Sequence, residues 1–131
     1  PILAGVAVVL LVLFLQYNRL IFAPIMAYVS PGNAPASEIE AIDLACKKLG
    51  GWRLPGCEMY VTMEPCCMCA GAIINARIPR VVYGAPDLRF GAFGSLINLA
   101  EIPLNHKPEI VGGVLGDECR EMLTNYFRRK R

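Results

Sequence analysis

The sequence predicts an α/β protein in which helices pack on a mixed sheet of five strands. Two observations support this fold class. Apolar, β-rich segments alternate with amphipathic helical segments along most of the chain, and the chain opens with an apolar run, 3–15, that is typical of a buried strand. With 131 residues and 55% hydrophobic content, the chain is long enough for one compact domain, 1–131, and too short for two.

Charge is almost absent from the first quarter of the chain. Of the 13 Lys and Arg and 11 Asp and Glu residues, only Arg19 lies before position 37. We interpret 3–15 as a central strand and 19–23 as a second strand, joined by a hairpin around the sequence QYNR. A membrane anchor is the alternative, but spanning a bilayer takes roughly 20 apolar residues. We therefore expect no membrane association.

The segment 37–49 has the pattern of an amphipathic helix. Ser37 and Glu40 have the spacing of a capping box, which sets the start of the helix, and Gly50 follows its end. Glu38 lies in the first turn, in line with the apolar side, so its carboxylate is expected to point towards the core. That apolar side consists of Ala41, Ile42, Ala45, Cys46 and Leu49.

The second half of the chain predicts three strands and two helices. The sequence EMYVTM, 58–63, is rich in β-formers and leads into Pro65, a residue favoured at the first helical position, so a helix is expected over about 65–76. RVVYGA, 80–85, and EIVGGVL, 109–115, are the further strands. Asp117 is expected to cap a last helix that reaches the basic end of the chain.

A pair of cysteines carries the main chemical signal. Cys66 and Cys69 stand three positions apart at the start of a helix, so they share a face, and the helix dipole there favours thiolates. Buried structural thiols, a redox dithiol and a metal site all have this spacing. The acidic helix upstream and the preceding Glu-Pro favour metal. Because Cys66, Cys67 and Cys69 crowd into four positions, disulfides among them are geometrically poor and a reduced, cytoplasmic setting is expected.

A longer resemblance starts from these cysteines. Pro65-Cys66-Cys67-Met68-Cys69 matches half of the zinc-deaminase signature H-x-E…P-C-x-x-C. The 94 residues from Glu38 to Arg131 resemble bacterial tRNA-specific adenosine deaminases without an obvious gap. The resemblance implies a three-layer α/β/α sandwich, a homodimer, and hydrolytic conversion of the wobble adenosine of a tRNA anticodon to inosine.

Carried across residue by residue, the resemblance gives an incomplete site. It implies that Cys66 and Cys69 bind Zn²⁺ and that Glu38 transfers protons while a zinc-bound water attacks C6 of adenine. The backbone N–H of Cys66 is a candidate for stabilising the developing charge. The zinc histidine of the signature falls on Ala36, which cannot coordinate a metal, and the sole histidine, His106, is a weak candidate for replacing it. The amphipathic first helix of the family is not recognisable in the sequence of residues 1–37 either.

Two further groups are candidates for binding the tRNA anticodon stem-loop. Arg89, Phe90 and Phe93 lie in a Gly-rich segment that resembles a family loop, where aromatic rings can stack on bases or simply pack. The basic residues at the chain end are either phosphate contacts or a solvated tail; the candidates there are Arg128, Arg129 and Arg131.

The missing ligand leaves two other functions open. One is a catalytically inactive module on the same fold that binds RNA or has a structural role. The other is a deaminase of a free base or nucleoside, which the loop and the basic chain end make less favoured. Metal content separates the first alternative from an active enzyme, and a substrate panel separates the second.

Overall fold

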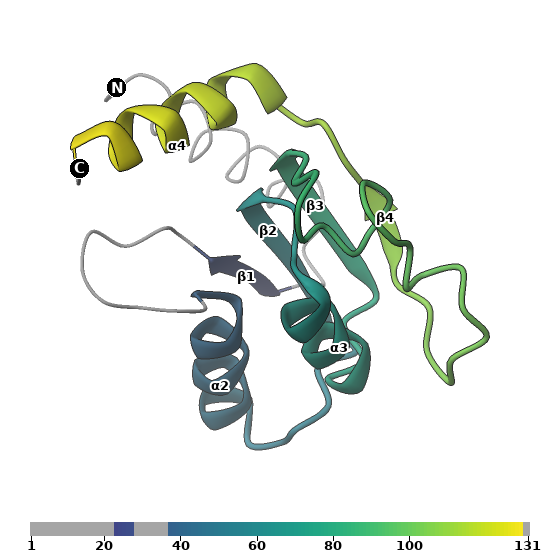
Figure 1. The fold of residues 1–131 in the computed structure, drawn as a ribbon. Coiled ribbons are helices and arrows are strands. Elements are labelled where there is room, and N and C mark those ends of the chain that lie inside the picture. Colours follow the sequence, from purple (N-terminus) through teal and green to yellow (C-terminus); the bar gives the residue numbers. More distant parts are fainter. Residues whose placement is uncertain (1–22, 28–36, 130–131) are drawn as a thin grey trace.

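The computed structural model describes residues 23–27 and 37–129 (Figure 1). Strands and helices alternate along most of the described chain, as the hydrophobic pattern predicts, and the described part is of the α/β class. In chain order the elements are β1 (Ala23–Ala27), α2 (Ser37–Leu49), β2 (Cys57–Met63), α3 (Cys67–Asn75), β3 (Arg80–Ala85), β4 (Glu109–Val111) and α4 (Gly116–Arg129).

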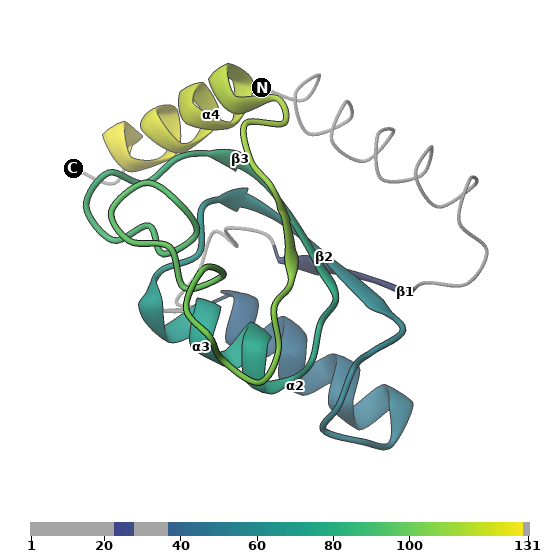
Figure 2. The same ribbon diagram turned by 90° about the vertical axis from the view of Figure 1, so that its right-hand side faces the viewer.

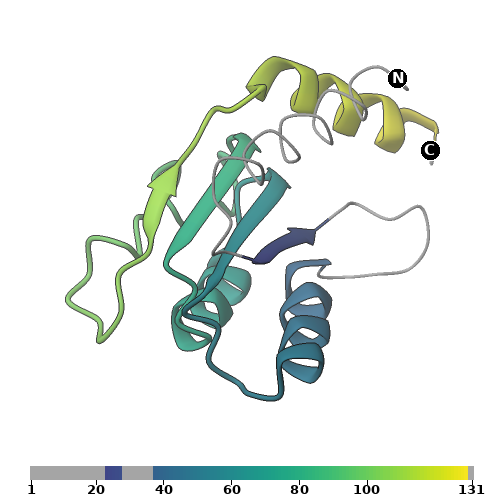
Figure 3. The same cartoon turned by 180° about the vertical axis from the view of Figure 1, so that it is seen from behind.

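The described strands form one sheet of four in the order β1-β2-β3-β4, and each neighbouring pair is parallel. Parallel neighbours need a crossover connection, which α2 supplies between β1 and β2 and α3 supplies between β2 and β3. Figures 1 and 3 show α2 and α3 together on one face of the sheet and α4 across the other face. The helices therefore enclose the sheet in three layers.

This sheet confirms the predicted one in part. The described residues contain four parallel strands, whereas the prediction was a mixed sheet of five. The expected strands 3–15 and 19–23 lie outside the described residues, except that Ala23 begins β1. The pattern does not predict β1 itself, because its sequence, APIMA, contains a proline and a single β-branched residue. A fifth strand and an antiparallel pair stay a prediction.

Strand β4 ends at Val111, four residues earlier than predicted. The next residue, Gly112, passes close to the neighbouring strand: a Cβ on it would lie 2.4 Å from the ring of Tyr83. The chain then turns through Gly113 and Leu115, both with positive φ (81° and 53°). Helix α4 begins at Gly116, so Asp117 lies in its first turn instead of capping it, which corrects that assignment.

The predicted helices are confirmed with small shifts at their ends. Helix α2 begins at Ser37 as predicted, and α3 begins two residues after Pro65, with Cys66 at its N-cap. Within the described ranges, no helix combines the length and the apolar character that a membrane crossing requires. The apolar run 3–15, the candidate anchor, lies outside those ranges.

The core lies between β2 and β3 and the two helices on one face of the sheet. Alternate residues of β2 point into it, and α3 adds Ile73, which is fully buried. The predicted apolar side of α2 packs against this core, except that Leu49 is 55% exposed. A smaller cluster on the other face of the sheet joins α4 to β3 and consists of Ala85, Cys119 and Leu123, with Leu115 packed beside it.

Candidate functional site

The predicted chemical groups meet at the edge of the sheet where the parallel strands end. Strand β2 ends at Met63, and Glu64 and Pro65 lead directly to Cys66 at the N-cap of α3. Helix α2 starts at Ser37, on the connection that follows β1. Because β1 and β2 are parallel, both helices begin at the same edge of the sheet, which is where open α/β sheets usually place their sites (Figure 2).

Glu38, Cys66 and Cys69 are in contact at this edge. The thiol of Cys69 is hydrogen-bonded to the side chains of Cys66 and Glu38. Cys69 is only 2% exposed, and Glu38 and Cys66 are partly buried. Burial, followed by the negative charge of Glu38 and then by Cys66, raises the pKa of the Cys69 thiol well above its usual range. The structure thus brings together the three residues that sequence reasoning selected for catalysis and metal binding.

The described groups do not make up a complete metal site. Within the described ranges, no set of three or more His, Cys, Asp or Glu side chains is arranged to hold a metal ion, although Glu38 reaches Cys69. Two thiols are the zinc donors present, and position 36, just before α2, carries alanine. Since zinc sites use three or four protein ligands, the described donors do not fit a complete site.

His106 does not supply the missing ligand. Its Nε2 lies 2.8 Å from the carbonyl oxygen of Ile78, two residues before β3 begins. In the sheet register Arg80 of β3 lies beside Glu58, near the start of β2. The cysteines follow the end of β2, and five residues of strand span about 16 Å. His106 therefore lies at the opposite edge of the sheet from the thiol pair.

The Gly-rich loop presents one of its two phenylalanines to solvent. Phe90 is 66% exposed and the neighbouring Arg89 is also exposed. Phe93 is 3% exposed and belongs to the main core cluster. This burial favours the packing role over base stacking for Phe93.

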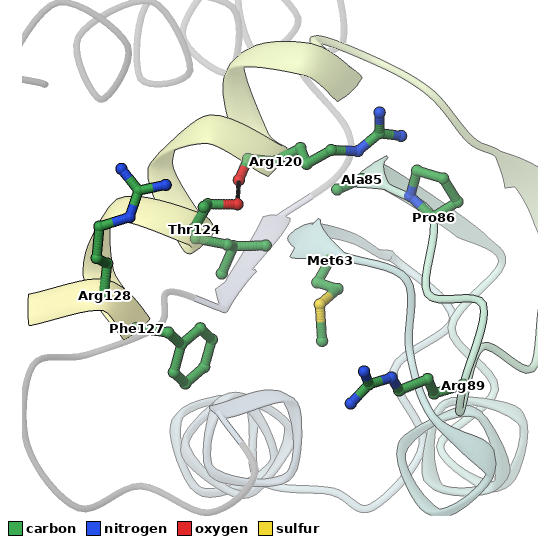
Figure 4. A pocket seen from close by; sticks show the side chains of 9 residues that line it. Met63, Ala85, Pro86, Arg89, Arg120, Thr124, Phe127 and Arg128 are labelled. Atoms are coloured by element: carbon green, nitrogen blue, oxygen red, sulfur yellow. Dashed lines mark hydrogen bonds between the residues drawn. The ribbon is translucent and has the colours of Figure 1, made fainter. Parts of the chain in front are cut away.

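A cavity of about 680 Å³ opens between the strand ends and α4 (Figure 4). Three arginines, Arg89, Arg120 and Arg128, surround an apolar floor, and the described lining includes no acidic side chain. Met63 in this lining stands three residues before Cys66, so the cavity lies at the same edge as the thiol pair. The lining residues are Met63, Ala85, Pro86, Arg89, Arg120, Leu123, Thr124, Phe127 and Arg128.

The cavity divides the predicted basic residues and adds one that sequence reasoning missed. Arg128 lines it, Arg129 is exposed on α4 and is not part of the lining, and Arg131 lies outside the described residues. Arg120 is the addition. It stands eight residues before Arg128, with Thr124 halfway between, and this spacing places all three on one face of a helix. This helical spacing in the sequence could have identified Arg120 as a partner of Arg128.

The fold and the arrangement of a glutamate beside a thiol pair at a helix start are those of nucleobase deaminases. A family model described as MafB19-like deaminase matches residues 18–131, and the chain belongs to this deaminase family.

Several relatives are tRNA-modifying enzymes. A tRNA-specific adenosine deaminase from Bacillus subtilis (strain 168) is 51% identical over 96 residues, which make up 72% of this chain and 60% of that protein. The enzyme of the same name from Agrobacterium fabrum (strain C58 / ATCC 33970) is 46% identical over 96 residues, 72% of this chain and 63% of that protein. The chain thus spans less than two thirds of the length of these relatives.

Solved structures give the same class. One, from a study of A-to-I editing by tRNA:A34 deaminases at the wobble position of transfer RNA, superposes with a TM-score of 0.63 at 45% identity and covers 66% of this chain and 63% of that one. A guanine deaminase from Nitrosomonas europaea superposes with a TM-score of 0.55 at 26% identity and covers 75% of this chain and 60% of that one.

Proposed function

We propose that this chain acts on the anticodon stem-loop of tRNA, where it converts the wobble adenosine to inosine by hydrolytic deamination. The observation that carries the proposal is the contact between Glu38, Cys66 and Cys69 at the sheet edge that also holds the arginine-lined cavity. Reacting groups and a polyanion-binding surface then lie at the same edge of the sheet. The resemblance to tRNA-specific adenosine deaminases supports the same substrate.

The cavity is suited to an RNA strand. Arg89, Arg120 and Arg128 offer positive charge to phosphates, and Phe127, which is 54% exposed, offers a ring for base stacking. The exposed ring of Phe90 lies next to Arg89 on the loop. A free base has no phosphate, so it cannot form ion pairs with the three arginines. The surface therefore favours a nucleic acid over a single base.

Glu38 is the residue that we assign to proton transfer. It lies in the first turn of α2, partly buried and in contact with Cys69, at the position of the glutamate in the deaminase signature. Deamination requires a proton to leave the attacking water, a proton to reach the purine ring and ammonia to depart, and one carboxylate within reach of these atoms can serve each step. Cys66 is the N-cap of α3, and its backbone N–H is the group that we propose for stabilising the developing charge.

Zinc is the metal that we propose for the thiol pair. Cys66 and Cys69 supply two sulfur ligands, and Ala36 supplies none where the signature has histidine. Two thiols alone hold zinc weakly. With alanine at position 36, the chain is therefore expected to bind the stem-loop but to deaminate it slowly. An inactive RNA-binding module is the corresponding alternative.

A deaminase of a free base is the second candidate, and the likeness to the Nitrosomonas europaea guanine deaminase favours it. The two candidates differ in the substrate that the Ala36→His variant turns over. We expect inosine from a synthetic anticodon stem-loop with adenosine at the wobble position, and no product from free guanine, adenosine or cytidine. Turnover of free guanine with no turnover of the stem-loop contradicts the proposal.

We further propose a homodimer and a cytoplasmic location. A second copy of the chain is suited to cover exposed apolar side chains near the site: Met68 is 61% exposed, Leu96 is 56% exposed and Ile97 is 41% exposed. Backbone hydrogen bonds hold these residues near one another. The N–H groups of Leu96 and Ile97 both donate to the carbonyl of Gly91, and Gly91 pairs with Cys66, two residues before Met68. Sedimentation of the wild type and of Leu96→Asp tests this interface. A monomeric wild type contradicts the homodimer, and two dimers of equal mass contradict the use of this surface. The location follows from the tRNA substrate.

A further inference from the structure

A buried carboxylate lies beside the site but is not one of its proposed reacting groups. Glu64 follows the end of β2 and precedes Pro65 and Cys66, and it is 2% exposed. Burying a charge is costly unless hydrogen bonds compensate for the lost water. Hydrogen bonds from Ser95, Asp87 and Phe93 outweigh the opposing effect of burial and keep the pKa of Glu64 below its usual value.

All the hydrogen-bond donors to Glu64 in the described part of the chain come from the loop 87–95. One oxygen, Oε1, accepts the backbone N–H groups of Phe93 at 3.0 Å and Ser95 at 3.1 Å. The other, Oε2, accepts the backbone N–H of Asp87 at 3.1 Å and the hydroxyl of Ser95. The two ends of the loop therefore bind to one carboxylate.

The middle of the loop is attached to the same segment. Gly91 pairs with Cys66 in an antiparallel bridge, and the N–H of Ala92 donates to the carbonyl of Pro65 at 2.9 Å. Gly91 also passes so close to the carboxylate that a Cβ there would lie 2.5 Å from the carboxyl carbon of Glu64. The position of the loop is thus fixed relative to the start of α3.

The hydrogen bonds continue from Glu64 to the exposed residues of the loop. Asp87, held by Glu64 through its N–H, accepts the backbone N–H groups of Arg89 at 2.9 Å and Phe90 at 3.2 Å through its side-chain Oδ1. Arg89 lines the cavity and Phe90 is 66% exposed. The backbone conformation that presents these two side chains therefore depends on Glu64.

We propose that Glu64 is a positioning residue for the RNA substrate, which holds Arg89 and Phe90 in the orientation that binds the strand. This inference rests on the proposed function, because it assigns Glu64 a role in RNA affinity. Without that role, Glu64 would only stabilise the fold. The two possibilities differ in whether the loss of Glu64 removes the contribution of Arg89.

A double-mutant cycle makes this distinction. The affinity for a synthetic anticodon stem-loop is measured for the wild type, Glu64→Gln, Arg89→Ala and the double variant, at a temperature where each is folded. Gln places an NH₂ group against N–H or O–H donors in place of one acceptor oxygen, so we expect Glu64→Gln to weaken binding about tenfold. Arg89→Ala should weaken wild-type binding by a similar factor and the Glu64→Gln variant by less than about twofold.

Glu58→Gln is the matched control. Glu58 is also buried, at 4% exposure, but it lies at the other end of β2 and bonds to Tyr60 and Arg80. We expect this control to leave RNA affinity within about twofold of wild type. Hydrogen exchange at the amides of Asp87, Phe93 and Ser95 should accelerate in Glu64→Gln and stay unchanged in the control. If Glu64→Gln does not fold, Ser95→Ala, which removes a single hydroxyl donor, replaces it in the cycle.

The possible outcomes separate this inference from the proposed function. Additive effects in the cycle, or unchanged affinity in Glu64→Gln while its loop amides exchange faster, overturn the positioning role and leave RNA binding intact. A wild-type chain that does not bind the stem-loop overturns both proposals. Coupled losses in affinity with faster exchange confined to the loop support the inference.

Discussion

Each end of strand β2 has a buried glutamate, and the two are stabilised in different ways. Glu58, at the beginning, accepts a hydrogen bond from the Tyr60 hydroxyl at 2.6 Å and lies 3.7 Å from the guanidinium of Arg80. Glu64, just after the end, is bound by donors from a loop, and within the described residues no Lys or Arg forms an ion pair with it.

The two edges of the sheet therefore stabilise a buried glutamate by different means. At the amino edge of the sheet a side-chain cation beside Glu58 neutralises the charge inside the sheet, which requires no particular loop conformation. At the carboxyl edge backbone amides stabilise the charge of Glu64, so the charge is stabilised only while the loop 87–95 keeps its conformation. We therefore expect substitutions at the carboxyl edge to change metal binding, chemistry and RNA affinity, and matched substitutions elsewhere to change little.

The largest effect is expected for zinc at the carboxyl edge. Ala36→His should raise zinc affinity by about a hundredfold to a thousandfold, since zinc binding in peptides contributes about 10–16 kcal/mol, which is about 2.5–4 kcal/mol for each of four ligands. Zinc titration by calorimetry measures the change. The gain should disappear when Cys66→Ala and Cys69→Ala are added. A gain that survives loss of both thiols, or no gain at all, contradicts the proposed ligand set.

The second largest effect is expected for Glu38, because its proposed role is proton transfer and not stabilisation of the fold. In the Ala36→His background, Glu38→Ala should leave zinc bound and lower inosine formation on the stem-loop by at least about a hundredfold, the lower range for loss of a general acid or base. Asp43→Ala is a control on the same helix, with an exposed side chain paired to Lys47. Turnover retained in Glu38→Ala would mean that Glu38 only stabilises the start of α2.

A smaller effect is expected at two glycines that lie at opposite edges of the sheet. Gly91→Ala brings a Cβ to 2.4 Å from the Asp87 carbonyl oxygen and 2.5 Å from Glu64, so we expect a loss of about 1–3 kcal/mol in the free energy of unfolding. Gly56 precedes β2 and has nothing within 4 Å of an added Cβ, so Gly56→Ala should change stability by less than about 0.5 kcal/mol. Denaturant unfolding measures both, and equal losses would contradict the comparison.

The sequence predicts the local parts of this molecule well. Strand β3 has the predicted bounds, and helical spacing explains why Cys66 and Cys69 share a face. The contact of Glu38 with Cys69 was implied only by the family resemblance, because β1, the strand that leads to α2, was not predicted from the sequence pattern. The hydrogen bonds of Glu64 were not predictable in the same way, since its partners lie 23 to 31 residues downstream and no spacing relates them. The burial of Phe93 likewise depends on tertiary packing.

The smallest effect concerns two adjacent arginines on α4. Arg128 lines the cavity with Arg120, whereas Arg129 is exposed outside the lining, although sequence reasoning treated them alike. Arg128→Ala should weaken stem-loop binding by a factor of about three to ten and lower the slope of log affinity against log salt by about one, as loss of one phosphate contact does. Arg129→Ala should change both quantities by less than half as much. Affinity measured across a salt series checks this. If both variants show the same slope, their charges act through the general field of the basic chain end, and the cavity gives Arg128 no separate contact with the strand.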